Sequence, residues 1–226
     1  MAYYQMINQQ KKFIVLFSPK CACTTLKRWF AESLENKEIV NQQALNKYQI
    51  SVKRIAQYTG YRKILFVRDP HDRLVSFYCK FIVYYTELWG FADGNKRVNL
   101  KGKTFSEFVH ILDELWKDGV HFQHHLEPQL AGLESIVPDK IVRIDDLDRE
   151  LVEISLDLGF EYVPKRLNAG NHSSDVSELV SEWHPNWFHS HGLPRHDCFY
   201  NKKLRGIVAR IYAPDLACYQ SKRLNR

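Results

Sequence analysis

Two cationic side chains, Lys20 and Arg68, stand where apolar runs give way to stretches with helical spacing. Lys20 begins a short loop after the run at 13–17, and the hydroxyl side chains of Thr24 and Thr25 follow it. Unpaired backbone N–H groups and the positive end of the helix dipole make the start of a helix a site for anions. A lysine adds a full charge there, so this loop is predicted to bind a phosphate or sulfate group.

Arg68 heads a second arrangement of the same kind, directly after the apolar run at 63–67. The planar guanidinium group of arginine can donate two parallel hydrogen bonds to a phosphate. Ser76 lies one helical turn beyond Arg73 and can donate its hydroxyl to the same phosphate, whereas Asp69 suits the start of a helix. These residues predict a second phosphate site beside the first.

The elements that must hold these residues follow an alternating order. Apolar runs at 13–17, 63–67 and 140–144 have the composition of buried strands, and the stretches between them have helical spacing. The order predicts an α/β fold with a central parallel sheet and helices on both faces. Ligands of such sheets bind beyond the carboxyl ends of the strands, which brings Lys20 and Arg68 to one edge.

Length and composition favour one domain over residues 1–226. A chain of 226 residues with 45% hydrophobic content can bury one sizeable core. The polar segment 164–200 is predicted to be a lid or substrate loop, with one short helix near 175–183. The net charge of +6 favours an anionic ligand, and since only this charge points toward nucleic acid, no nucleic-acid partner is predicted.

The five cysteines and the lack of long apolar runs indicate in which cellular compartment the protein works. An odd number of cysteines without a recognisable disulfide framework suits a reducing compartment, so we expect a soluble, cytoplasmic protein. No run of eighteen apolar residues occurs, so no membrane span is expected in this chain. No metal is expected either, because the pair Cys21 and Cys23 has no second cysteine pair and the histidines at 184–196 match no zinc spacing.

The two phosphate segments resemble motifs of the sulfotransferases that use 3′-phosphoadenosine 5′-phosphosulfate. The first segment, Pro19-Lys20-x-x-x-Thr24-Thr25, resembles their 5′-phosphosulfate loop. The second segment resembles their 3′-phosphate motif over Val67-Arg68-Asp69-Pro70-x-x-Arg73-Leu74-x-Ser76-x-Tyr78. The resemblance implies the P-loop-like sulfotransferase fold.

A third segment points to one branch of that family. Carbohydrate sulfotransferases of the chondroitin and HNK-1 type carry a His-Trp-x-Pro-Gln segment, which His125, Pro128 and Gln129 match. Within the family, the chain most resembles the carbohydrate enzymes of the chondroitin, HNK-1 and heparan 2-O types. Leu126 replaces the tryptophan, which puts the contact with the acceptor in doubt. The resemblance implies a carbohydrate hydroxyl as the acceptor.

The same resemblance implies roles for individual residues. The donor, whose product is adenosine 3′,5′-bisphosphate, would be bound by Pro19, Lys20, Cys21, Ala22, Cys23, Thr24, Thr25, Arg68 and Ser76. Lys20 would also stabilise the leaving group. The catalytic base remains open among four residues, of which His125 is favoured over Glu32, Glu35 and His124.

Two other functions compete with sulfuryl transfer. A P-loop kinase could use Asp145 or Asp146 to hold magnesium, but the first loop contains no glycine, whereas a Walker A loop requires it. A non-catalytic homologue that binds the nucleotide and has lost its base is the second alternative.

Overall fold

A computed structural model of the chain describes residues 4–34, 44–84, 98–164 and 174–221. Residue contacts divide the chain into two compact units, each assembled from separate stretches. Unit 1 comprises Met1–Arg68, Gln129–Ala169 and Ser221–Arg226, and unit 2 comprises Asp69–Pro128 and Gly170–Gln220. The expectation of one domain over 1–226 stays a prediction.

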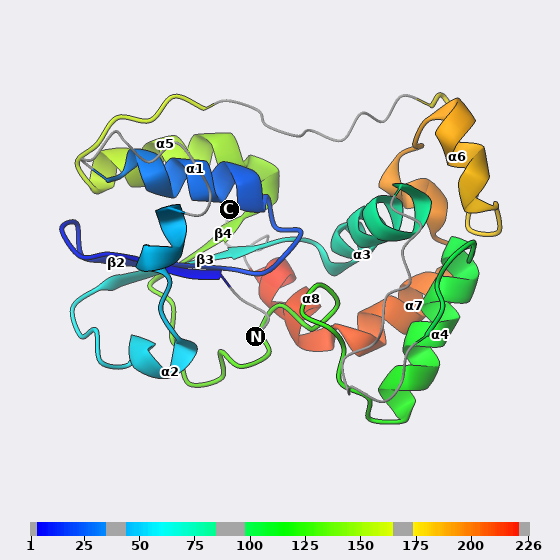
Figure 1. Cartoon of the computed structure of the whole chain (residues 1–226), viewed down its shortest axis with the longest axis horizontal. Coiled ribbons are helices and arrows are strands. Elements are labelled where there is room, and N and C mark those ends of the chain that lie inside the picture. The colour runs from blue at the N-terminus through cyan, green and yellow to red at the C-terminus, as the bar shows by residue number, and fades with distance from the viewer. Residues whose placement is uncertain (1–3, 35–43, 85–97, 165–173, 222–226) are drawn as a thin grey trace. The chain divides into compact units, whose positions relative to one another are not determined.

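Unit 1 is built on a four-stranded mixed sheet (Figure 1). Its strands lie in the order β1 (Tyr4–Asn8), β2 (Phe13–Phe17), β3 (Arg62–Val67) and β4 (Lys140–Arg143). The strands β2, β3 and β4 run parallel, as predicted, and every residue of β2 is buried. The α/β fold with a central sheet flanked by helices is therefore confirmed.

The first strand, β1, was not predicted, and it makes the sheet mixed because it pairs antiparallel with β2. Its polar residues hide it in the sequence, yet Gln5 and Asn8 are 3% and 1% exposed. The Asn8 side-chain amide donates to the backbone oxygen of Ser33 at 3.1 Å and to its hydroxyl at 3.0 Å. Partners at the end of the following helix thus permit a buried amide where an apolar residue would be expected.

Two helices cover one face of this sheet, α1 (Cys23–Glu32) and α5 (Leu147–Asp157), as Figure 1 shows. Trp29 of α1 packs on the sheet, with its ring 5.7 Å from that of Phe13 and 5.9 Å from that of Phe66. The one-turn helix α2 (Val52–Ile55) lies on the other side, and the short 3₁₀ segments Ala44–Tyr48 and Ile144–Asp146 complete the described elements of unit 1.

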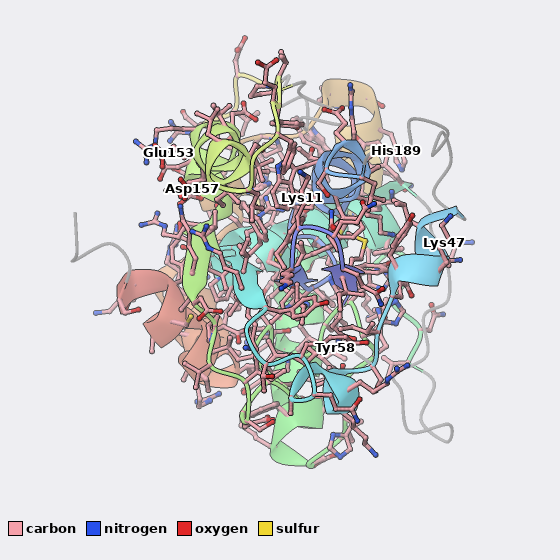
Figure 2. All side chains as sticks on the ribbon, turned by 90° about the vertical axis from the view of Figure 1, so that its left-hand side faces the viewer. Lys11, Lys47, Tyr58, Glu153, Asp157 and His189 are labelled. Carbon is pink, nitrogen blue, oxygen red and sulfur yellow. The ribbon has the colours of Figure 1, made fainter. Side chains whose placement is uncertain are left out.

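The edge of the sheet at the β1–β2 hairpin faces the viewer in Figure 2. Lys11 lies in that hairpin, and its ammonium group donates to the Gly159 backbone oxygen at 3.3 Å. Glu153 and Asp157 project from α5, whereas Lys47 belongs to the 3₁₀ segment Ala44–Tyr48. This edge is at the amino end of β2, opposite to the loop that carries Lys20.

Unit 2 is helical. Its elements are α3 (Pro70–Tyr78) with the π-helical continuation Cys79–Tyr84, α4 (Phe105–Lys117), α6 (Pro185–His191), the 3₁₀ turn His196–Phe199, α7 (Lys202–Ile211) and α8 (Ala213–Ser221). Its core combines aliphatic side chains with many aromatic ones, and the rings of Phe77 and Phe108 stack 5.6 Å apart. No helix among the described residues is long and apolar enough to cross a membrane.

Helix starts in unit 2 show where local signals succeed and fail. The predicted capping box before α4 is present, with Thr104 and Glu107 each bonded to the other's backbone N–H. The prediction of a short helix near 175–183 is wrong, because the helix in this region, α6, begins later, at Pro185. There the His184 ring accepts from the Asn186 N–H at 3.3 Å, and a proline suits the first helical position.

The contact between α1 and α5 can be tested through one buried hydrogen bond. The Trp29 indole N–H donates to the Ser155 hydroxyl at 2.8 Å, and both side chains are fully buried. Removing the acceptor with Ser155→Ala leaves a buried donor unpaired, so the free energy of unfolding should fall by about 1 to 3 kcal/mol. Urea unfolding of Ser155→Ala, Trp29→Phe and the double variant should show a combined loss smaller than the sum. Additive losses would contradict the coupling.

Candidate functional site

The loop between β2 and α1 turns its backbone toward an anion without using glycine. Lys20 and Ala22 have φ angles of 68° and 53°, in the left-handed region that side chains other than glycine rarely adopt. Each such residue costs about 1 to 2 kcal/mol, and such strain is typical of functional loops. Turns that contain left-handed residues can direct backbone N–H groups toward an anion, so this conformation suits a phosphate or sulfate.

The start of α1 adds to the same site. Ala22 stands at the N-cap position, and no side chain there accepts a hydrogen bond from the first turn. The N-terminal N–H groups of a helix have no partner within the helix and carry the positive end of its dipole. Thr24 is exposed and Thr25 is 7% exposed on this turn, whereas Pro19 and Cys21 are buried beneath it.

The two thiols of the loop carry protons, since Cys21 donates to the Gln129 side-chain oxygen at 2.9 Å and the pKa of Cys23 is raised. Burial raises the pKa of Cys23, although backbone hydrogen bonds and the charges of Lys27 and Lys20 act in the opposite direction. Its thiol donates to the Ser18 backbone oxygen at 3.4 Å, and Cys21 is completely buried. The loop therefore presents no thiolate charge to an incoming anion.

Arg68 follows β3 at the same edge of the sheet. Because β2 and β3 are parallel, with Phe17 opposite Phe66, the segments that follow the two strands emerge together. One guanidinium nitrogen of Arg68, Nη1, donates to the Lys20 backbone oxygen at 3.0 Å. No described carboxylate pairs with Arg68, so its other donors can serve an anion.

Gln129 is the residue of this site whose role sequence reasoning missed. Its side chain is 1% exposed and hydrogen-bonds to the backbone of Arg68 and to the thiol of Cys21. The sequence marked Gln129 only as a match to the carbohydrate-type segment, with no role attached. A polar residue directly after Pro128 gives no local signal that it is buried.

Unit 2 carries the remaining predicted phosphate contact, Ser76, on α3. Ser76 is partly exposed, and its hydroxyl has no hydrogen-bond partner among the described residues. Asp69 caps this helix by accepting from the His71 N–H at 2.8 Å, as its position predicted. Arg73 is only 3% exposed, and its Nη2 donates to the His125 backbone oxygen at 3.0 Å. Arg73 is therefore structural in unit 2, while Ser76 stays a predicted contact.

The four candidate bases fall in different places. Glu32 is exposed in the last turn of α1 and pairs with Arg28 at 2.8 Å. Nine residues separate it from the start of that helix, a rise of about 14 Å, so its position argues against a role at the loop. Glu35 lies outside the described residues.

The two histidines lie next to each other in unit 2. Their ring centroids are 4.0 Å apart, and the His125 ring also meets Phe81 edge to face at 4.9 Å. Nδ1 of His125 lies 3.1 Å from the Gln123 side-chain oxygen, which holds the ring in place. Partial burial lowers the pKa of His124, so its imidazole is neutral at pH 7 and able to take up a proton.

No group of three or more His, Cys, Asp or Glu side chains in the described parts of the chain could hold a metal ion. A cavity of about 690 Å³ lies at the opposite edge of the sheet, around Asn8 and Tyr48. None of the predicted donor-binding residues lines it. At the carboxyl edge, backbone groups, a lysine and an arginine lie together, an arrangement that suits an anion.

Comparisons with known proteins agree with this chemistry. The model of a family described as the sulfotransferase family matches residues 4–220, nearly the whole chain. Neither a search of curated proteins nor a search of solved structures found a match.

The charge of Asp69 should make stability depend on pH. Burial acts to raise the pKa of Asp69, but hydrogen bonds and the charge of His71 outweigh it and hold this pKa below its usual range. The charged Asp69 carboxylate therefore stabilises the fold fully above its unfolded pKa of about 3.9. This stabilisation is lost as pH falls through its lower pKa in the folded protein. Asp69→Ala should lower the free energy of unfolding by about 1 kcal/mol at pH 7.

The matched variant Asp69→Asn separates charge from capping, since an asparagine can still accept from the His71 N–H. Its loss relative to the wild type should be smaller than that of Asp69→Ala at pH 7 and should shrink as pH falls below the unfolded pKa. Urea unfolding of both variants between pH 3 and pH 7 measures this. A loss that does not change with pH would show that the charge is irrelevant.

The protonation of Cys23 can be tested by alkylation. Because burial raises the pKa of Cys23, iodoacetamide should modify this residue slowly at pH 7.5, and the rate should still be rising with pH above about 9. Mass spectrometry of the peptide that contains Cys23 measures the rate, with unfolded protein as the control. Rapid modification that has reached its plateau by pH 7.5 would indicate a thiolate in the loop instead.

Proposed function

The chain belongs to the sulfotransferase family, and we propose that it transfers a sulfuryl group from 3′-phosphoadenosine 5′-phosphosulfate to a hydroxyl of a carbohydrate. One observation carries the proposal. The hydrogen bond from the Arg68 guanidinium to the Lys20 backbone oxygen joins two cationic segments at the carboxyl edge of one sheet. A donor with phosphates at both ends of one adenosine needs two such segments.

The residues present fit this donor. The left-handed loop with Lys20 suits the 5′ end of the donor, where the sulfate is attached, and Arg68 suits the 3′-phosphate. Arg68 ends unit 1 and α3 begins directly after it, so we assign Ser76 of α3 to the 3′-phosphate as well. The donor supplies a sulfuryl group on a phosphate that is a good leaving group.

The reaction requires the protein to assist both the acceptor and the leaving group. The acceptor oxygen forms its bond to sulfur as the bond from sulfur to the phosphate oxygen breaks, and the hydroxyl proton passes to a base. Negative charge grows on the phosphate oxygen that departs. Lys20 and the N–H groups of the loop stabilise this charge, as cations do in phosphoryl transfer.

We assign the base to the pair His124 and His125, and His125 remains our first choice. A neutral imidazole can accept the acceptor's proton, and the lowered pKa of His124 keeps that residue in the neutral form. The fixed ring of His125 offers the better-defined orientation. The carbohydrate acceptor rests on the segment His125 to Gln129, which resembles that of carbohydrate sulfotransferases.

A kinase finds less support at this edge. The two candidates for magnesium both lie near arginines in the described structure: Asp145 pairs with the Arg143 guanidinium, and Asp146 lies 3.9 Å from that of Arg149. The lysine loop reaches its left-handed conformation at Lys20 and Ala22, without the glycines of a Walker A loop. Sulfuryl transfer therefore remains the better explanation of both segments.

Adenosine 3′,5′-bisphosphate should bind and raise the melting temperature. At a hundredfold excess over its Kd the stabilisation is about 2.7 kcal/mol, which corresponds to about 5 °C or more for a chain of this size. Lys20→Ala and Arg68→Ala each remove a charged contact with the ligand and should raise the Kd about 10- to 100-fold. Lys53→Ala serves as the matched control, because Lys53 is exposed on α2. Stabilisation by ATP but not by the bisphosphate would contradict the proposal.

Transfer itself needs a separate experiment. Donor labelled with ³⁵S should pass its label to at least one member of a panel of glycans, and His125→Ala should lower kcat by about 10²-fold or more. Binding of the bisphosphate without transfer to any hydroxyl acceptor would support the non-catalytic homologue instead.

A further inference from the structure

The Gln129 side chain joins the two cationic segments through three hydrogen bonds. Its Oε1 accepts from the Arg68 backbone N–H at 2.9 Å and from the Cys21 thiol at 2.9 Å. Its Nε2 donates to the Arg68 backbone oxygen at 2.8 Å. The side chain is 1% exposed, so these bonds are shielded from water, and breaking one would leave a buried polar group unpaired.

The two groups that Gln129 holds are the backbones that carry the cations. Arg68 is the residue after β3, and Gln129 bonds both its N–H and its C=O, as a neighbouring strand would. Cys21 is the middle residue of the loop, between the left-handed residues Lys20 and Ala22. A shift of Gln129 would therefore disturb the conformation of the loop and the position of Arg68 together.

The chain path gives this link added importance. The chain leaves unit 1 after Arg68 and returns to it at Gln129. The two residues at which the chain departs and returns are thus hydrogen-bonded to each other inside unit 1. Since the backbone of Arg68 is fixed by an amide, its guanidinium can extend from a constant position.

We propose that Gln129 is a positioning residue for the donor: it sets the separation between the Lys20 loop and Arg68, so that both can bind one bisphosphate. The proposal rests on the proposed function, since it assumes that the two segments share one ligand. Gln129 itself touches the protein's backbone and a thiol, and acts through Lys20 and Arg68.

The chemistry of glutamine suits this position. The amide accepts and donates at once, whereas a glutamate at 129 would lose the donor to the Arg68 oxygen and add negative charge near the anion. An asparagine is one methylene shorter and could not reach the same groups. The Cys21 thiol supplies a donor without a charge, and serine is its nearest replacement.

The first experiment compares a ligand that needs both segments with ligands that need one. Calorimetric titration measures the Kd of adenosine 3′,5′-bisphosphate, 5′-AMP and 3′-AMP for the wild type and for Gln129→Ala. If Gln129 sets the separation of two sites, its loss should raise the Kd of the bisphosphate about tenfold or more. Each monophosphate, which can settle on one segment, should change by less than about threefold. Gln57→Ala is the matched control, because Gln57 is exposed.

A second measurement separates positioning from stability. In an Arg68→Ala background the second segment no longer binds, so Gln129→Ala should weaken the bisphosphate by a smaller factor than in the wild type. The loss of melting temperature caused by Gln129→Ala should be the same in both backgrounds. A structural role alone would lower the melting temperature without this coupling in Kd.

Two variants of Cys21 keep the test valid if Gln129→Ala does not fold. Cys21→Ser retains a donor to Oε1 of Gln129 and Cys21→Ala does not, so Cys21→Ala should bind the bisphosphate more weakly than Cys21→Ser. Gln129→Glu should behave like Gln129→Ala or worse, because its charge repels the ligand.

The outcomes separate this inference from the proposed function. If the wild type binds the bisphosphate but Gln129→Ala weakens all three ligands equally, or none, Gln129 is not a positioning residue and the proposed function stands. If the wild type binds none of the three ligands, the proposed function fails and this inference fails with it.

Discussion

The parallel pairing of β2 with β3 is the constraint on which the anion site depends. Because both strands end at the same edge, the backbone that follows each of them emerges beside the other, and Lys20 and Arg68 arrive together. The hydrogen bond between the Arg68 guanidinium and the Lys20 oxygen exists only because of this pairing. The helix α1 then begins within the same short stretch and brings the positive end of its dipole to the same edge.

The lysine loop contains backbone strain at two positions where a glycine would adopt the same conformation without strain. Lys20 and Ala22 adopt left-handed conformations that persist only when neighbouring contacts hold them. Those contacts are visible: Cys21 is buried between them, its thiol donates to Gln129, and the N–H of Cys21 donates to the Ser18 oxygen at 3.3 Å. A lysine in place of glycine puts the positive charge on the turn itself, so the same residue that adopts the left-handed conformation also carries the charge.

The two units contribute different kinds of support. Unit 1 offers backbone groups at strand ends, next to a strand in which every residue is buried. Unit 2 offers side chains, with Ser76 on α3 and the adjoining rings of His124 and His125 in a turn.

What the sequence by itself determined is local: the apolar strands, the capping box at Thr104, the helix start at Asp69, and the two motifs with Lys20 and Arg68. Such features are set by residues close in the chain, so their patterns survive without the fold. Tertiary structure alone decided that the polar segment Tyr4–Asn8 is a strand and that the helix expected near 175–183 begins instead at Pro185. It also decided that Gln129, 61 residues after Arg68, bonds to the Arg68 backbone. Buried polar partners far apart in the chain leave no periodic signal, because each is buried only once the other is in place.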